Sequence, residues 1–215
     1  MVKRKPGRPS LSNTLPLNTI LEAALQVFSE DGYGGTHLKD IAQSLGVTNP
    51  VMSYRFESKR DLWEKAMEFL GDKLVERFHA IQLEYNALEG IPVMRAYVTQ
   101  YIYFLAENPA LYKILAQEMG QKSWRSQFLI DKLFNPLIWF GEKSIESPMD
   151  SLKEFKTIPR PNFISIILGA SSSFFALEQL LKSQYGSDVF DQEQIKHHAE
   201  VVNRIIFDQF EHKTK

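Results

Sequence analysis

Residues 38–56 read LKDIAQSLGVTNPVMSYRF, a stretch that has the pattern of two short helices joined by a tight turn. Ala42 is small where two helices must cross closely, and Gly46, four residues later, supplies the turn. The stretch predicts a helix-turn-helix, and an ordinary helical hairpin is the alternative. Four apolar side chains are spaced to point inward and hold the helices together: Ile41, Leu45, Val47 and Met52.

The outward face of the second helix in this pair carries side chains that suit DNA. No acidic residue lies between Gly46 and Phe56, so nothing in this helix repels phosphate. Asn can make two hydrogen bonds to adenine and Arg two to guanine, Val and Pro can touch a thymine methyl, and Tyr, Ser and Thr bind phosphate oxygens. Unpaired N–H groups at the start of the next helix also favour a phosphate. The predicted DNA contacts in this region are Thr48, Asn49, Pro50, Val51, Ser53, Tyr54, Arg55 and Lys59.

Charge is divided unevenly along the chain. The formal net charge is −1, from 25 Lys and Arg against 26 Asp and Glu. Residues 1–21 hold four of the basic residues and no acidic one, which leaves 21 basic and 26 acidic residues for the other 194. This asymmetry is typical of a nucleic-acid contact at one end. The sequence KRKPGRP at residues 3–9 suits the narrow minor groove, with Arg4 and Arg8 as predicted contacts, and a solubilising tail is the alternative.

Apolar residues recur at spacings of three and four along nearly the whole chain, which indicates helix almost throughout. The first helix is expected to open at a Thr19–Glu22 capping box, or a turn earlier with Pro16 in its first turn, and to close at Gly32. A fourth helix opens at Ser58, and no stretch has the period of two that predicts a strand. The remaining helices are predicted near residues 38–45, 49–56, 92–106, 109–119, 124–145, 162–184 and 191–210.

A further set of residues recurs at fixed spacings before, within and after the helix-turn-helix. Together they resemble the DNA-binding domain of the TetR family of transcriptional regulators over residues 17–75. The family usually has a Thr where this chain has His37, and a Tyr that grips a phosphate where it has Ser53, so Tyr54 or Arg55 is the candidate for that contact. The matching residues are Ile20-Leu21, Ala23-Ala24, Phe28, Gly32-Tyr33, Thr36, Ile41-Ala42, Gly46-Val47-Thr48 and Phe56-Glu57-Ser58-Lys59.

The resemblance implies an all-α fold of about nine helices. It consists of an N-terminal three-helix helix-turn-helix domain and a C-terminal helical domain for effector binding and dimerisation. We expect a basic arm over residues 1–12, the DNA-binding domain over residues 13–75, and the effector-binding and dimerisation domain over residues 76–215. The resemblance also implies that Thr36 contacts DNA.

The last two predicted helices offer more apolar surface than a helix buried on one face needs. Gly169 and Ser173, four residues apart, permit close approach of another helix. A well-buried pair inside a monomer is one explanation, and a four-helix bundle between two subunits is the other. The resemblance favours the second, so we expect a homodimer that binds a near-palindromic operator in double-stranded DNA.

The C-terminal region is rich in large aromatic residues, which suit an apolar pocket for a small molecule, although a packed core accounts for them equally well. The predicted function is a transcriptional regulator, a repressor that a small, largely apolar or aromatic effector releases from DNA. An architectural DNA-binding protein without an effector is the alternative, and an all-α enzyme is a more distant one. The predicted effector contacts are Tyr101, Phe104, Glu118, Phe128, Trp139 and Phe174.

Several classes of protein are excluded by what the sequence lacks. With no cysteine there is no disulfide, thiol nucleophile or Cys-based zinc site. The five histidines show no metal-ligand spacing, and no nucleotide-binding or hydrolase motif occurs, so no catalytic, metal or cofactor site is predicted. No apolar segment follows the basic start, and the apolar stretch 162–177 is shorter than the roughly 20 residues that a membrane helix needs. We therefore expect a cytoplasmic protein that is neither an enzyme nor a membrane protein.

Overall fold

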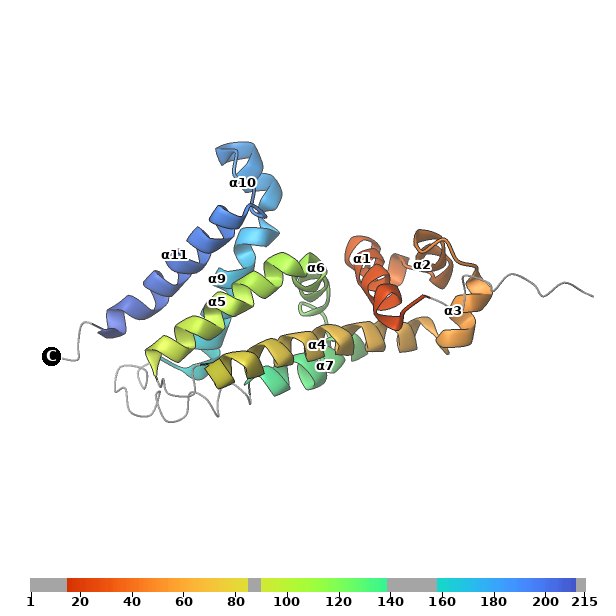
Figure 1. The fold of residues 1–215 in the computed structure, drawn as a ribbon, viewed down its shortest axis with the longest axis horizontal. Helices are drawn as coiled ribbons and strands as arrows, with labels where there is room; N and C mark the ends of the chain where they lie inside the picture. The colour runs from red at the N-terminus through yellow and green to blue at the C-terminus, as the bar shows by residue number, and fades with distance from the viewer. Residues whose placement is uncertain (1–14, 85–89, 139–157, 212–215) are drawn as a thin grey trace, which may run out of the picture.

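The computed structural model describes residues 15–84, 90–138 and 158–211, and all regular structure in these ranges is helical, which confirms the predicted all-α class. The three N-terminal helices gather at one end of the molecule, a long helix runs from them along its length, and the last three helices lie at the other end (Figure 1). The elements are α1 (Leu17–Gly35), α2 (Leu38–Ser44), α3 (Asn49–Arg55), α4 (Lys59–Glu84), α5 (Ile91–Glu107), α6 (Pro109–Glu118), α7 (Trp124–Leu129), the π-helical turn η2 (Ile130–Phe134), α9 (Arg160–Ala176), α10 (Glu178–Tyr185) and α11 (Gln192–Glu211).

Helix α1 begins directly after Pro16, whose ring holds φ at −57°. The start therefore lies at the earlier of the two predicted positions, and the Thr19–Glu22 pair does not cap it. The apolar stripe that contains Ile20, Ala24 and Phe28 is buried where α1 packs on α4 and α6. Gly32 has φ 68° and ψ 166°, so the regular helix breaks at the predicted residue.

Helices α2 and α3 form the predicted helix-turn-helix. Gly46 has φ 64° between them, in the region that a residue with a Cβ rarely adopts, and the Val47 amide donates to the Ala42 carbonyl over 2.9 Å. Met52 and Phe56 are 0% and 1% exposed. Each such buried side chain contributes about 1.5–3 kcal/mol of hydrophobic stabilisation, which fixes the rotation of α3 about its own axis.

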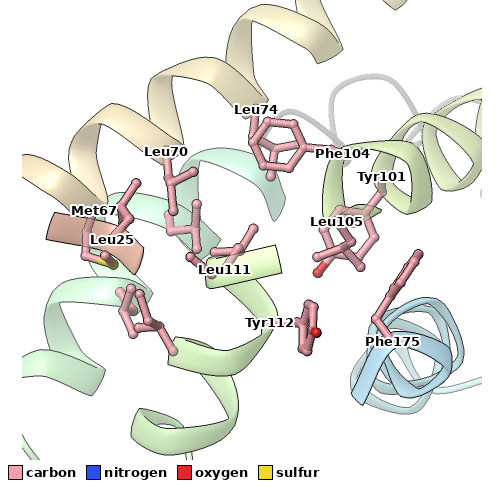
Figure 2. Packing of buried hydrophobic residues seen from close by; sticks show 14 of the residues in the cluster. Leu25, Met67, Leu70, Leu74, Tyr101, Phe104, Leu105, Leu111, Tyr112 and Phe175 are labelled. Atoms are coloured by element: carbon pink, nitrogen blue, oxygen red, sulfur yellow. The ribbon is translucent and has the colours of Figure 1, made fainter. Parts of the chain in front are cut away.

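Helix α4 is continuous across residue 75, where the sequence placed a domain boundary. One part of it packs on α1 and other parts on η2 and α5. Figure 2 shows the consequence: Leu25 of α1, Met67 and Leu70 of α4, and Leu111 of α6 lie in the same group of buried side chains. The DNA-binding end and the C-terminal body therefore share one hydrophobic core.

One predicted helix is divided in the structure, and another is described only in part. The predicted helix 162–184 is broken at Leu177, which has φ −96° and ψ 16°, and α9 and α10 meet there at a bend of 59°. The predicted helix 124–145 is α7 followed by η2, and residues 139–157 lie outside the described part of the chain. None of the described helices is by itself long and apolar enough to cross a membrane, and the bent pair α9–α10 meets that test only when its two helices are taken together.

Candidate nucleic-acid interface

One face of α3 and the turn before it is turned to solvent. Thr48, Asn49, Pro50, Ser53 and Tyr54 are exposed, and Tyr54 has 88% of its surface free. We call these five residues the reading face; none of them carries a charge. All five were predicted as DNA contacts, whereas Val51, also predicted, is half-buried. Because Met52 and Phe56 are buried behind it, the reading face is held by packing.

Arg55 does not point its guanidinium into open solvent beside the reading face. Its Nη1 donates a hydrogen bond of 2.7 Å to the carbonyl of Leu15, 40 residues earlier and just before α1. One of the five N–H donors of the guanidinium is thus engaged by a backbone carbonyl, and the reading of a guanine by Arg55 stays a prediction.

Lys59 is likewise engaged within the protein. Its Nζ donates to the carbonyls of Tyr33, over 2.7 Å, and Thr36, over 2.9 Å, and it stands 4.4 Å from the centre of the Tyr33 ring. These bonds tie the start of α4 to the connection between α1 and α2, and the phosphate contact of Lys59 stays a prediction.

Thr36 is fully buried, which corrects its prediction as a DNA contact. Its hydroxyl donates to the Gly32 carbonyl over 2.8 Å, and its amide donates to the same oxygen over 3.2 Å. The side chain therefore closes the end of α1.

An exposed cation that the sequence did not single out is Lys39 of α2, which has no hydrogen bond or ion pair among the described residues. Only its exposure in the folded chain identifies it.

The helix-turn-helix meets the body of the protein at a junction made by α1 and α4 on one side and α6 and α7 on the other. Gln117 of α6 donates through Nε2 to the Ser29 carbonyl of α1 over 2.9 Å. Trp124 of α7 packs edge-on against Tyr33 at 5.4 Å and Trp63 at 5.3 Å between ring centres. A shift of α6 or α7 must therefore displace α1 or break these contacts.

A buried ion pair lies in the same junction. Glu118 is 5% and Arg125 19% exposed, and their side chains are joined at 2.7 Å, while the second carboxylate oxygen of Glu118 is buried without a partner. Arg125 also lies over the Tyr33 ring at 4.8 Å. Burial raises the pKa of the Tyr33 phenol, against the opposing effect of Arg125, so the ring stays neutral at physiological pH.

Comparison with known proteins agrees with this geometry. Residues 20–66 match the sequence model of a family described as "Bacterial regulatory proteins, tetR family". The biofilm operon icaADBC HTH-type negative transcriptional regulator IcaR of Staphylococcus aureus strain Newman is 38% identical over 55 residues, which span 26% of this chain and 30% of IcaR. The HTH-type transcriptional regulator RutR of Escherichia coli strain K12 is 24% identical over 204 residues, 94% of this chain and 93% of RutR. The helix-turn-helix segment of the chain, residues 20–66, therefore matches the TetR family.

The likeness to a solved structure extends beyond the matched helix-turn-helix. The crystal structure of the transcriptional regulator FadR from Bacillus subtilis in complex with stearoyl-CoA is similar at a TM-score of 0.64, with 14% identity, over 87% of this chain and 97% of FadR. At that identity the likeness shows the fold alone. Within the parts of the chain that the structure describes, no group of three or more His, Asp or Glu is placed to hold a metal ion.

The predicted effector contacts that the structure describes come from four helices, α5, α6, α7 and α9. Glu118 and Phe128 lie in the junction, where Phe128 packs against Trp63 at 5.6 Å. Phe174 stacks on His198 of α11 at 4.4 Å.

The other predicted effector contacts are Tyr101, Phe104 and Trp139. Tyr101 and Phe104 are buried on α5 among the side chains of Figure 2, and burial raises the pKa of the Tyr101 phenol. Trp139, with Arg4 and Arg8 of the predicted arm, lies outside the described residues.

Proposed function

We propose that this chain is a sequence-specific, cytoplasmic DNA-binding transcriptional regulator of the TetR family that acts as a homodimer and that a small, largely apolar effector releases from its operator. The observation that carries the proposal is the reading face: five exposed, uncharged residues on a helix whose opposite side is buried. A helix fixed in this way enters the major groove with its donors and acceptors preset.

The reading face supplies the chemistry for base recognition without a charged residue. Asn49 can pair with an adenine edge through two hydrogen bonds, and Pro50 can contact a thymine methyl. Ser53 and Tyr54 place hydroxyls within reach of phosphates on either side of the groove. The electrostatic attraction between the protein and the DNA phosphates must then come from outside the reading face. We propose the basic residues of the arm, Arg4 and Arg8 among them, as its source.

Exposed apolar side chains at the far end of the molecule support the dimer. Ile166, Leu177, Leu180 and Ile205 are about half or more exposed, at 51%, 47%, 51% and 69%. A Cβ placed on Gly169 would meet no atom within 4 Å, so α9 has room there for the close approach of a second helix. Two copies joined through α9 and α11 would present two reading faces, as a near-palindromic operator requires.

The junction is the proposed route by which an effector acts. An effector that binds against the buried face of α5 and displaces α6 or α7 must disturb the bond from Gln117 to Ser29 or the packing of Trp124 on Tyr33. Either change moves α1, which packs on α4 and carries the helix-turn-helix. Since FadR is known in complex with stearoyl-CoA, an acyl-CoA is the first effector class to test.

The experiment has two stages. DNA that the purified full-length chain retains from a random pool is sequenced, and two protomers per near-palindromic site are expected by sedimentation. Stearoyl-CoA is then titrated against the protein with and without that DNA. Effector release requires that DNA weaken acyl-CoA binding by the same factor by which acyl-CoA weakens DNA binding. Failure to enrich any sequence would refute the regulator, and acyl-CoA binding that DNA leaves unchanged would refute release by this class.

A further inference from the structure

Two hydroxyl groups are buried on α5 and α9 without a hydrogen-bond partner among the described residues. Ser171 of α9 is 0% exposed, and its Oγ has no partner there. Tyr101 of α5 is 7% exposed, and burial raises the pKa of its phenol with no hydrogen bond to offset that effect. Leaving a buried hydroxyl unpaired destabilises the folded chain, so neither group is explained by a contribution to stability.

The aromatic side chains around them place the two hydroxyls in the same region. Phe175 lies one helical turn after Ser171, about 6 Å along α9, and both residues are buried. The Phe175 ring stacks on the Tyr112 ring of α6 at 6.0 Å between ring centres. Tyr101 belongs to the same group of buried side chains (Figure 2), and the helices that carry these residues, α5, α6 and α9, all pack on one another.

The chemistry of this region suits an uncharged acceptor oxygen on a bound molecule. A carbonyl oxygen has two lone pairs, so it can accept a hydrogen bond from each hydroxyl. A carboxylate is disfavoured, because the burial that raises the pKa of Tyr101 opposes a negative charge at this place. The rings of Tyr112 and Phe175 offer apolar surface to the rest of the molecule.

From these contacts we infer that Tyr101 and Ser171 bind the carbonyl oxygen of the effector, an apolar molecule that is uncharged at this end. The inference rests on the proposed function, because it names the chemical class of the effector that releases the regulator. A molecule bound here also contacts α6 through Tyr112, and α6 is the helix whose Gln117 bonds to Ser29 of α1. Acyl thioesters and aromatic ketones both carry such a carbonyl.

Two pairs of probes test whether a carbonyl is recognised. Stearoyl-CoA is compared with S-octadecyl-CoA, which has a methylene in place of the carbonyl, and acetophenone is compared with ethylbenzene, which differs in the same way. Dissociation constants are measured on the full chain without DNA, by calorimetry for the first pair and by NMR titration for the second. In at least one pair the carbonyl probe should bind about 5- to 100-fold more tightly, as one or two hydrogen bonds require, and that pair identifies the source of the carbonyl.

Equal binding within both pairs, or no binding of any of the four probes, would overturn the inference. Benzoate should bind more weakly than acetophenone because its carboxylate loses its hydration on burial. Tighter binding of benzoate would overturn the assignment of an uncharged group. Because no DNA takes part, these results are separate from the selection of an operator, whose failure refutes the proposed regulator.

Removing the hydroxyls should affect binding and stability differently. Tyr101→Phe and Ser171→Ala should each weaken binding of the preferred carbonyl probe about 5- to 10-fold, and the double variant should bind both members of that pair alike. The midpoint of urea unfolding should stay the same or rise in each variant, because each deletes an unpaired group. A lower midpoint in either variant would overturn the inference, since it would show that the hydroxyl is paired within the folded chain.

Ser172→Ala is the matched control on the same helix. The Ser172 hydroxyl donates to the Leu168 carbonyl over 2.7 Å, so it already has a partner within α9. Its removal should leave the preference for the carbonyl probe unchanged. A loss of that preference in Ser172→Ala as large as in Ser171→Ala would overturn the assignment of Ser171.

Discussion

Lys59→Met tests whether this cation stabilises the fold or binds DNA. The substitution keeps most of the side-chain stem and removes the ammonium group that donates to the Tyr33 and Thr36 carbonyls. If these contacts are the function of Lys59, the variant should lose free energy of unfolding and bind operator DNA almost normally once folded. A phosphate contact predicts the reverse.

The expected loss follows from the contacts. Each of the two hydrogen bonds from the charged group contributes about 1.5–3 kcal/mol. The lower value applies to each, because Lys59 is half-buried and both carbonyls regain water in the variant. The ammonium over the Tyr33 ring adds about 0.5 kcal/mol. Ordering the lysine side chain costs about 1 kcal/mol, which the variant recovers in part. The free energy of unfolding should therefore fall by about 2–3 kcal/mol.

Urea unfolding followed by tryptophan fluorescence measures this loss, at one fixed protomer concentration because dimerisation contributes to stability. Lys39→Met is the control: Lys39 is exposed without a described partner, so its free energy of unfolding should change by no more than about 0.5 kcal/mol. Unchanged stability in Lys59→Met, together with weaker binding to all DNA sequences and a salt slope shallower by about one, would refute the structural role.

Three further outcomes are expected. Gly46→Ala should lower the free energy of unfolding by about 1–2 kcal/mol. The loss comes from backbone strain alone, since φ is 64° and no atom lies within 4 Å of the added Cβ. Gly120→Ala is the control: it has the same free space and no positive φ, so it should lower the free energy of unfolding far less in the same urea titration. Burial lowers the pKa of His198 from its usual 6.5, so the folded state binds this proton less tightly than the unfolded chain and stability should fall as pH drops below 6.5 through the folded value. His198→Gln should flatten that part of the stability curve, and an unchanged curve would show that His198 does not cause it. Deleting residues 1–9 should leave the circular dichroism unchanged and shallow the slope of log affinity against log salt by about 3–4 for each bound protomer, as four neutralised phosphates per arm require.

Local sequence signals were enough to predict the helix-turn-helix. Position 46 has φ 64°, which glycine adopts without strain. Met52 and Phe56 lie at the spacing that buries one side of a seven-residue helix. The break at Leu177 was not predictable in this way, because the apolar spacing continues through it and only tertiary packing decides that α9 ends there.

The roles of Arg55 and Lys59 could not be read from the sequence for a related reason. A guanidinium or an ammonium donates equally well to a phosphate, a base edge or a carbonyl, and composition does not say which acceptor is near. Their acceptors, Leu15, Tyr33 and Thr36, are 23 to 40 residues away along the chain. Helical spacing likewise does not predict that Phe128 packs against Trp63 and Phe174 against His198. The spacing shows which side of its own helix a residue occupies, but it does not show which other helix lies against that side.

Asn49→Ala tests whether an uncharged face of α3 reads the DNA sequence. The quantity to measure is the ratio of the dissociation constants for the selected operator and for a shuffled sequence, by fluorescence anisotropy at one salt concentration. If Asn49 pairs with a base, the operator should be bound about 5- to 100-fold more weakly while the shuffled sequence is bound as before, so the ratio collapses. A ratio that stays unchanged, because both sequences or neither lose affinity, would show that Asn49 reads no base.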